Sequence, residues 1–291
     1  MMKGIIIINP YFAPKESVYQ AERLKEEFNN LGVDVDIVAN AFLTSCLDNG
    51  ALNATLKDVD FAVYLDKDKY QSEILSRVGV RLFNSHDAIR LCDDKAQTYI
   101  ALSCSNLKMP KTVFGALCYR QDLAVKPEWA DTIGKTLGYP VIVKESFGSM
   151  GKGVYMAKDN KELLAIMKNV KLKPHIFQQY IGAVYGVDVR VIVIGGQAVC
   201  AMERRNENDF RSNVAQGGTG VKIELNDKFK KAAEKCAKVL GLDYCGVDLL
   251  YGDDGEPYVC EVNSNAFIGG IESATGENVA KRYAEYIISK L

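Results

Sequence analysis

Short apolar runs alternate with amphipathic stretches along the first third of the chain. Residues 4–8 hold four consecutive isoleucines, which is typical of a buried strand. Residues 17–32 follow with apolar side chains at helical spacing, and Gly32 marks the helix stop. Further strands are predicted at residues 33–38, 61–65 and 80–84, with a short helix at 70–79. This alternation predicts a small parallel sheet with helices on its faces.

The pattern then changes from strand–helix alternation to hairpins. Residues 85–103 predict a single helix with Ser85 as its N-cap, which we expect to bridge two domains. A compact α+β region follows at about 110–180, and the last third contains two β-hairpins. The predicted strands are 139–145, 153–158 and 175–181, the hairpins 187–205 and 246–264, and the helices 129–138, 160–170, 229–241 and 277–291.

Composition excludes several classes of function. The 291 residues are 48% hydrophobic and carry a net charge of −1, so bulk charge gives no support for nucleic-acid or membrane-surface binding. No apolar run approaches the length of a membrane span, and we expect a cytoplasmic protein. The eight cysteines form no C-x-x-C pair, which favours free thiols. Two histidines exclude a histidine-rich metal site.

A glycine-rich loop lies between two predicted strands in VIVKESFGSMGKGV, residues 141–154. Gly148, Gly151 and Gly153 have a spacing that matches neither the P-loop nor the dinucleotide-binding motif. Such a loop can fold over phosphates, because glycine lets backbone N–H groups approach closely. Lys144 could then reach a phosphate oxygen. A mobile surface hairpin with a solvated lysine is the alternative interpretation of this stretch.

The second hairpin predicts a metal site. Glu261 and Asn263 are two positions apart on one strand, so their side chains point to the same face. The turn at Asp253–Gly255 lies near the midpoint between Asp248 and Glu261, which places these two carboxylates close together. Oxygen ligands of this kind suit Mg²⁺. The alternative is an exposed sheet face with scattered polar groups.

Arginines lie between the glycine loop and the second hairpin. Arg190 and Asp188 share one strand face, Arg204 ends the next strand, and Arg211 and Asn213 lie in a polar loop. Arginine forks bind phosphate and carboxylate groups at two points. Surface pairing of the arginines with nearby acidic residues is the alternative.

In combination, these stretches resemble the ATP-grasp superfamily, and within it the RimK-like branch of amino-acid ligases. The matching segments are NSHDAIRLCDDKAQTY, YPVIVKESFGSMGKGV, FQQYI, VDVRVIV, MERRNENDFRSNVAQGG, GVDLL and EVNSN…GIESATG, in the order of the family, across about residues 84–280. The resemblance implies an α/β (α+β) fold with a small N-terminal parallel-sheet domain, a central lid and a C-terminal antiparallel-sheet domain. The implied boundaries are 1–94 and 95–291, with the lid at about 110–180 and the C-terminal subdomain at about 181–291.

The resemblance also implies roles for individual residues. ATP is expected between the lid and the C-terminal sheet, with two Mg²⁺ ions, or Mn²⁺ in their place, held by Asp248, Glu261 and Asn263. The residues implied to contact ATP are Lys95, Lys144, Ser146, Ser149, Met150, Gly151, Gly153, Gln178, Gln179, Tyr180, Ile181 and Asp188. The residues implied to surround the reacting phosphate and acyl group are Arg190, Arg204, Arg211 and Asn213.

The implied function is an ATP-dependent carboxylate–amine ligase that forms an amide through an acyl phosphate. The resemblance favours addition of an amino acid, glutamate first, to a peptide, protein or small-molecule acceptor, by a dimer or tetramer. A kinase of the same fold and a non-catalytic ATP-binding module are the alternatives. The family often has Ser-Ser-Pro after the metal asparagine, whereas this chain has Ser264–Phe267, and Gln179 stands where glutamate is frequent. The first departure leaves the identity of the substrates open, and the second is expected to adjust only the contact with the base.

Overall fold

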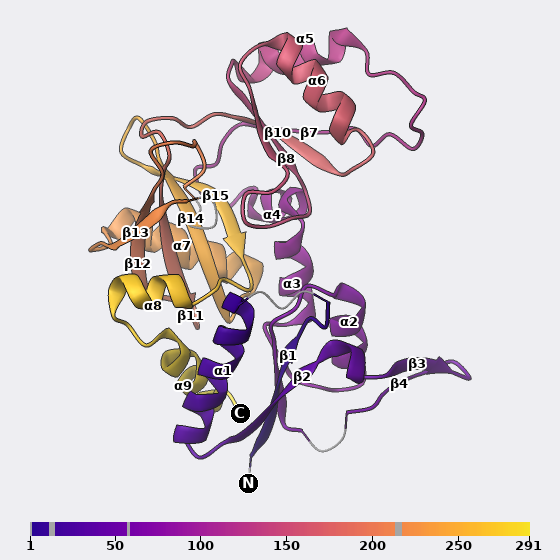
Figure 1. Cartoon of the computed structure of the whole chain (residues 1–291), viewed down its shortest axis with the longest axis vertical. Helices are drawn as coiled ribbons and strands as arrows, with labels where there is room; N and C mark the ends of the chain where they lie inside the picture. The colour runs from indigo at the N-terminus through magenta and orange to yellow at the C-terminus, as the bar shows by residue number, and fades with distance from the viewer. Residues whose placement is uncertain (1, 12–14, 57–58, 213–216) are drawn as a thin grey trace.

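The computed structural model describes residues 2–11, 15–56, 59–212 and 217–291. Over these residues the chain forms a four-stranded N-terminal sheet, a second four-stranded sheet, a five-stranded sheet and a separate two-stranded hairpin. Figure 1 shows three lobes, with the second four-stranded sheet at the top, the five-stranded sheet at the left and the N-terminal sheet below. The mixed α/β class is therefore confirmed, whereas the domain boundaries stay predictions.

The N-terminal sheet has the strand order β2-β1-β5-β6, and its pairs are parallel. Ile6 and Ile7 of the first strand are fully buried, as the isoleucine run predicts. The bounds are β1 Lys3–Ile8, α1 Lys15–Asn30, β2 Asp34–Ala39, β5 Phe61–Tyr64, α2 Lys69–Arg77 and β6 Leu82–Phe83.

A two-stranded antiparallel hairpin projects from this lobe (Figure 1). It consists of β3 Ser45–Asp48 and β4 Ala51–Ala54, after the short 3₁₀ helix η1 Asn40–Phe42. The sequence pattern did not predict it, because its strands are short and mostly exposed and therefore lack a strong apolar alternation.

The predicted single helix over residues 85–103 is wrong in one respect. The structure has two helices there, α3 His86–Asp93 and α4 Lys95–Leu102. Asp94 has an extended backbone, and its side chain accepts hydrogen bonds from the backbone N–H groups of Ala96 and Gln97. Aspartate is a strong N-cap residue, so it starts a second helix here. The predicted N-cap of the first helix, Ser85, is confirmed.

The second four-stranded sheet has the antiparallel order β7-β10-β8-β9. Two helices pack against it around the buried side chains of Val143, Leu163 and Phe177. The bounds are β7 Thr112–Phe114, α5 Pro127–Leu137, β8 Val141–Glu145, β9 Val154–Ala157, α6 Asn160–Val170 and β10 His175–Gln179. The loop between β8 and β9 contains the glycines that the sequence singled out.

The C-terminal sheet has the antiparallel order β13-β12-β11-β14-β15, and both predicted hairpins are present. Helix α7 packs on one face, while α8 and α9 pack with α1 on the other. The bounds are β11 Val187–Ile194, β12 Gln197–Arg205, β13 Thr219–Lys222, α7 Asp227–Leu240, β14 Tyr244–Tyr251, β15 Pro257–Asn263, α8 Gly269–Thr275 and α9 Val279–Ser289. Strand β13, which is short, was not predicted.

Asn84 joins the N-terminal sheet to the C-terminal sheet. Its amide Nδ2 donates to the carbonyls of Tyr244 and Ser264 at 2.8 and 2.9 Å. Its Oδ1 accepts from the backbone N–H groups of Asp243 and Tyr244 at 2.7 and 2.9 Å. One buried side chain thus satisfies four backbone groups of another lobe. Within the described ranges, no helix combines the length and apolar character that crossing a membrane requires.

Candidate functional site

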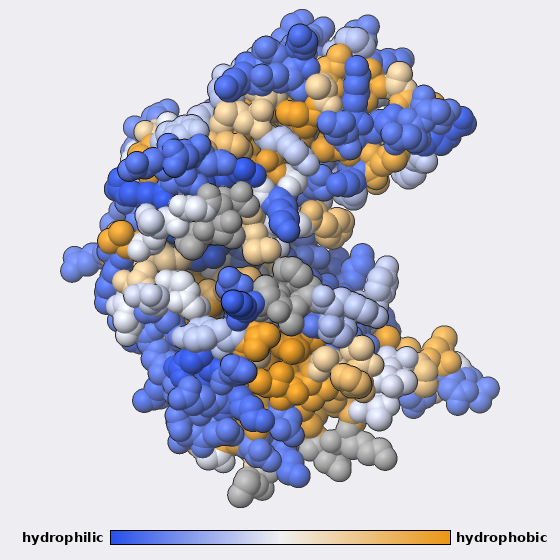
Figure 2. All heavy atoms as spheres, viewed as in Figure 1, coloured by the Kyte–Doolittle hydropathy of each residue, from blue (hydrophilic) through white to orange (hydrophobic). Residues whose placement is uncertain are grey.

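A cleft of about 770 Å³ opens between the second four-stranded sheet and the C-terminal sheet. Figure 2 shows a separate, wider hollow on the right side of the molecule, between the upper lobe and the N-terminal lobe. The described residues that line the cleft are Lys95, Pro110, Ile142, Lys144, Gly151, Val154, Gln178, Gln179, Tyr180, Ile181, Val184, Gly186, Val187, Asp188, Phe210, Arg211, Ser212, Leu250, Cys260 and Glu261.

Two buried lysines lie in the wall of this cleft. Lys95, the first residue of α4, and Lys144 of β8 are each 8% exposed. Burial lowers the pKa of Lys144, but the acidic groups of Cys260, Tyr99 and Glu261 around it raise that pKa above its ordinary value. Lys144 is therefore a cation at neutral pH, with its Nζ 3.3 Å from the Cys260 carbonyl oxygen. Such buried cations are suited to an anionic ligand.

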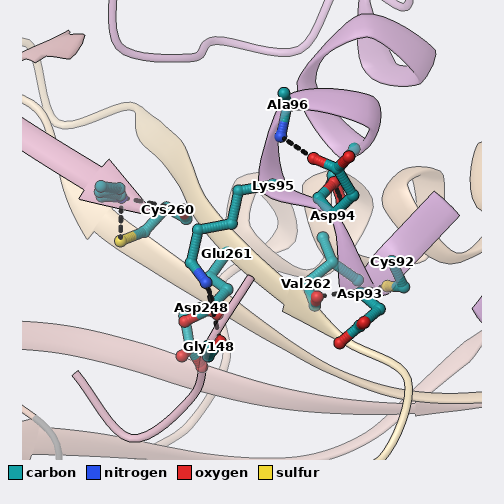
Figure 3. A network of polar contacts seen from close by, with 12 residues as sticks. Cys92, Asp93, Asp94, Lys95, Ala96, Gly148, Asp248, Cys260, Glu261 and Val262 are labelled. Atoms are coloured by element: carbon teal, nitrogen blue, oxygen red, sulfur yellow. Dashed lines mark hydrogen bonds and ion pairs between the residues drawn. The ribbon is translucent and has the colours of Figure 1, made fainter. Parts of the chain in front are cut away.

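Lys95 connects the glycine loop to the C-terminal hairpin. Its Nζ donates to the carbonyl oxygen of Gly148 at 2.9 Å and lies 3.4 Å from the Glu261 carboxylate. Figure 3 shows the side chain extending from α4 between these two groups. Three segments that are far apart in the sequence thus meet at one ammonium group.

The glycine loop has the backbone that its composition predicts. Gly148, Gly151 and Gly153 have φ values of 136°, 74° and 73°, and Met150 has a φ of 57°. The loop begins and ends in the antiparallel pair β8–β9, with Lys144 opposite Val154. Positive φ is unstrained only for glycine, which explains why the loop needs three of them.

Two buried polar groups beside the cleft lack partners within the described part of the chain. Gln178 is 1% exposed, and its amide Nε2 donates to Thr112 Oγ1 at 2.9 Å. Its Oε1 has no hydrogen-bond partner, and the same is true of Ser146 Oγ. Unsatisfied buried polar atoms are costly, so a ligand that supplies hydrogen bonds fits here. With two buried cations and a glycine loop, the cleft fits a nucleotide polyphosphate.

The second hairpin brings its carboxylates together. Asp248 of β14 and Glu261 of β15 are direct cross-strand partners, and Gly246 pairs with Asn263. Cys260 is the extra residue of a bulge that shifts the register by one position, and this shift brings Glu261 opposite Asp248. Glu261 lines the cleft. Among the described residues no group of three or more His, Cys, Asp or Glu side chains gathers for a metal. The predicted ligands Asp248, Glu261 and Asn263 are two carboxylates and one amide.

This donor set fits Mg²⁺, which takes oxygen ligands and commonly binds through few protein groups plus phosphates. Asp248 is fully engaged by arginines. Arg190 Nε and Nη2 donate to its two oxygens at 2.8 Å each, and Arg204 Nη2 lies 2.8 Å from Oδ2. Burial raises the pKa of Asp248, but the two guanidinium groups lower it below its usual range. Asp248 is therefore ionised, and both of its oxygens accept from arginines in this structure, so a metal ion would share the carboxylate with these guanidinium groups.

The predicted arginines occupy different environments. Arg204 is 2% exposed and pairs with Asp188 at 2.7 and 2.5 Å. Arg211 lines the cleft, pairs with Asp209, and donates to the carbonyl of Gly151 at 3.0 Å. The surface-pairing alternative thus describes part of Arg211's environment but not that of Arg204. Asn213 lies outside the described residues.

The segment after Asn263, the predicted metal ligand, packs against the N-terminal sheet. Asn265 Nδ2 donates to the carbonyl of Leu65 at 2.8 Å. Tyr244 donates its hydroxyl to the Ala266 carbonyl at 2.6 Å, and a Cβ on Gly246 would lie 2.5 Å from Ala266 Cβ. Asn265 and Ala266, which stand where the family often has Ser-Ser-Pro, therefore pack at the junction between the N-terminal sheet and the C-terminal sheet.

The cleft unites most of the predicted nucleotide contacts. Ten predicted residues line it: Lys95, Lys144, Gly151, Gln178, Gln179, Tyr180, Ile181, Asp188, Arg211 and Glu261. The lining does not include Ser146, Ser149, Met150, Gly153, Arg190, Arg204, Asp248 or Asn263. Sequence reasoning missed Cys260 and Ser212. The adjacency of Cys260 to Glu261 and of Ser212 to Arg211 was the available signal.

Comparison with known proteins agrees with this geometry. A model of the RimK-like ATP-grasp domain matches residues 92–287. Human N-acetylaspartylglutamate synthase A is 34% identical over 233 residues, covering 79% of this chain and 58% of that protein. A probable alpha-L-glutamate ligase of Psychromonas ingrahamii is 31% identical, covering 94% of this chain and 92% of that one.

The fold also recurs among solved structures. The ATP-grasp ligase PsnB, in complex with a minimal precursor, Mg and ADP, superposes with a TM-score of 0.70 at 19% identity, covering 99% of this chain and 96% of PsnB. This chain spans little more than half the length of the human relative, so family membership and fold are what these matches establish. By its matched domain and its fold, the chain belongs to the RimK-like ATP-grasp family.

Proposed function

We propose that the chain is an ATP-dependent carboxylate–amine ligase that forms an amide bond through an acyl phosphate. The observation that carries the proposal is the position of Lys95, which contacts both the glycine loop at Gly148 and the carboxylate of Glu261. A cation between a phosphate-type loop and a metal-type carboxylate is placed for the terminal phosphates of a nucleotide.

The nucleotide lies along the cleft in this proposal. Gln178 presents an unpartnered Oε1 that can accept a hydrogen bond from the amino group of adenine. Lys144 and Lys95 bind phosphate oxygens beneath the glycine loop. Asp248, Glu261 and Asn263 would hold Mg²⁺, which neutralises charge on the phosphates. The sequence expectation of two ions, with Mn²⁺ as an alternative, stays part of the proposal.

The protein contributes positions and charges to the reaction. A substrate carboxylate attacks the terminal phosphorus of ATP, and ADP leaves. An amine then attacks the acyl phosphate, and inorganic phosphate leaves with formation of the amide. Arg190 contacts the Asp248 carboxylate and Arg211 contacts the glycine loop, and in this proposal they stabilise the charge that develops on phosphate and acyl oxygens. No nucleophilic side chain is needed, because ATP supplies the activated group.

We propose glutamate as the amino acid that is added, to a peptide, protein or small-molecule acceptor. The support is the probable alpha-L-glutamate ligase that covers nearly the whole chain, and the glutamate-containing product in the name of the human relative. The proposed cytoplasmic location and a dimeric or tetrameric assembly rest on the family alone.

The test is incubation of the protein with ATP, Mg²⁺, glutamate and a pooled panel of acceptors that carry either a carboxylate or an amine. The proposal requires equal amounts of ADP and inorganic phosphate, with a new amide product detected by mass spectrometry. A kinase would instead give ADP with a stable phosphorylated product and no free phosphate. A binding module would bind the nucleotide and release neither.

A further inference from the structure

Arg204 occupies a position in the C-terminal sheet that differs from those of the other arginines. It lies on β12, opposite Asp188 of β11, and only 2% of it is exposed. Its Nε and Nη2 donate to Asp188 at 2.7 and 2.5 Å. The same Nη2 lies 2.8 Å from Oδ2 of Asp248, on the next strand along. One guanidinium group therefore joins carboxylates from two strands.

The two carboxylates belong to different parts of the site. Asp188 lines the cleft, whereas Asp248 pairs with Glu261 on the hairpin proposed to hold the metal. Arg204 is absent from the described residues that line the cleft, although Asp188 and Arg211 are among them. Its Nε and Nη2 contact these two aspartates.

We propose that Arg204 is a positioning residue that fixes Asp188 of the nucleotide cleft and Asp248 of the metal site relative to each other. This inference rests on the proposed function, because it takes the cleft to bind a nucleotide and the hairpin to bind a divalent ion. It differs from the sequence expectation, which placed Arg204 against the reacting phosphate. Affinity for the nucleoside part of ATP and affinity for the ion then both depend on this one side chain.

The charges of the cluster explain why arginine is required. Arg190 and Arg204 balance Asp188 and Asp248, so the buried group of four is neutral as a whole. A planar guanidinium can bind one carboxylate at two points and still reach a second one. A lysine preserves the charge but has a single nitrogen, so it cannot bind Asp188 at two points and reach Asp248 in the same fixed geometry. Arg204→Lys changes geometry while charge stays constant.

The experiment measures two affinities of Arg204→Lys. Adenosine, which carries no phosphate, is titrated by calorimetry. Mn²⁺ is titrated by electron paramagnetic resonance with protein saturated by a non-hydrolysable ATP analogue. We expect both dissociation constants to rise by about tenfold or more, as displaced supporting groups typically cause. Arg205→Lys, on the same strand but exposed and paired with Glu203, is the matched control and leaves both constants unchanged.

Arg211→Lys distinguishes positioning from phosphate contact. Because Arg211 contacts the glycine loop, Arg211→Lys is expected to lower the affinity for the ATP analogue and to leave the affinity for adenosine unchanged. If Arg204→Lys shows that same pattern, or lowers the affinity for only one of adenosine and Mn²⁺, the inference is overturned. The two proposals can fail separately. If Arg204→Lys weakens adenosine and Mn²⁺ binding as expected, but the wild type never releases phosphate, the proposed ligase activity is refuted and the inference about Arg204 stands.

A second variant covers the case in which Arg204→Lys does not fold. The double variant Asp188→Asn with Arg204→Met removes one charge of each sign, so the cluster stays neutral and Arg190 still pairs with Asp248. We expect its Mn²⁺ affinity to be about tenfold weaker than that of the wild type. An Mn²⁺ affinity equal to that of the wild type would overturn the inference.

Discussion

Asp248 and Glu261 are cross-strand partners only because the register of their hairpin shifts by one residue at Cys260. Nearer the turn, Tyr251 pairs with Pro257 and Leu249 with Val259. Continuing that register would place Cys260 opposite Asp248 and turn Glu261 to the other face. The bulge therefore sets which side chain faces the cleft, as bulges near functional sites often do.

Glu261→Gln should abolish most of the activity while keeping the shape of the side chain. The amide cannot supply the negative charge that a divalent ion needs, and several kcal/mol of charge stabilisation are lost with the ion. We expect phosphate release to fall on the order of 100-fold. Asp253→Asn, in the exposed turn of the same hairpin, is the control. Full activity of Glu261→Gln would refute the metal assignment.

Lys95→Met should weaken ATP binding. A charge-assisted hydrogen bond contributes about 1.5–3 kcal/mol, which corresponds to an increase of roughly 10- to 100-fold in the KM for ATP. Steady-state phosphate release at varied ATP measures this, with Lys161→Met on the exposed face of α6 as the control. An unchanged KM for ATP would show that Lys95 does not contact the phosphates.

Gly153→Ala should impair the glycine loop beyond its effect on stability. Gly153 has a φ of 73°, and an added Cβ would lie 3.0 Å from the Glu145 side chain. The positive φ costs roughly 1 kcal/mol for alanine. Gly255→Ala, with a φ of 71° in an open turn, carries the same backbone strain far from the cleft. Calorimetry should show weaker ATP binding for Gly153→Ala alone, and equal affinities would contradict the role of the loop.

Asn84→Ala should destabilise the junction between the sheets. The substitution removes four hydrogen bonds to backbone groups at the junction. We expect the free energy of unfolding in urea to fall by about 3 kcal/mol or more. Asn53→Ala, whose exposed side chain contacts only its own hairpin, should change it by less than about 0.5 kcal/mol. A loss for Asn84→Ala no larger than that control would show that the clamp does not stabilise the fold.

Asp243→Asn should stabilise the protein at neutral pH. Burial raises the pKa of Asp243 above its usual value, while the hydrogen bond from Tyr286 partly opposes this. A carboxyl group whose pKa is raised by folding lowers the free energy of unfolding when the pH is above its folded-state pKa. This loss disappears when the pH falls below the pKa in the unfolded chain, which is about 3.9. Denaturant unfolding at pH 7 and pH 3 should show an advantage of the variant at pH 7 only. A wild type that is at least as stable at pH 7 would contradict the prediction.

Local patterns predicted the parts of the fold with strong signals. The isoleucine run marked β1, the glycines marked the β8–β9 loop, and the turn at Asp253–Gly255 placed Asp248 near Glu261. Each depends on residues that are close in sequence, where periodicity and turn chemistry are decisive.

Other features depend on contacts between distant segments. Arg190 and Arg204 both lie on strands of one sheet, and nothing in their local sequence separates the arginine near the cleft from the arginine buried between two aspartates. The bulge at Cys260 and the contact of Lys95 with Gly148 likewise arise only when strands and helices assemble. Asp94 is a local signal for the helix break, because aspartate is a favoured N-cap residue. The helical spacing of apolar residues continues on both sides of it, however, and this spacing favours a single helix.

Product analysis tests the central claim most directly. The protein is incubated with ATP, Mg²⁺, glutamate and pooled acceptors, and ADP, phosphate and products are quantified together. The account predicts that ADP, phosphate and a glutamate-containing amide appear in equal amounts, and that Glu261→Gln makes almost none. ADP accompanied by a phosphorylated product without free phosphate, or nucleotide binding without any turnover, would contradict it.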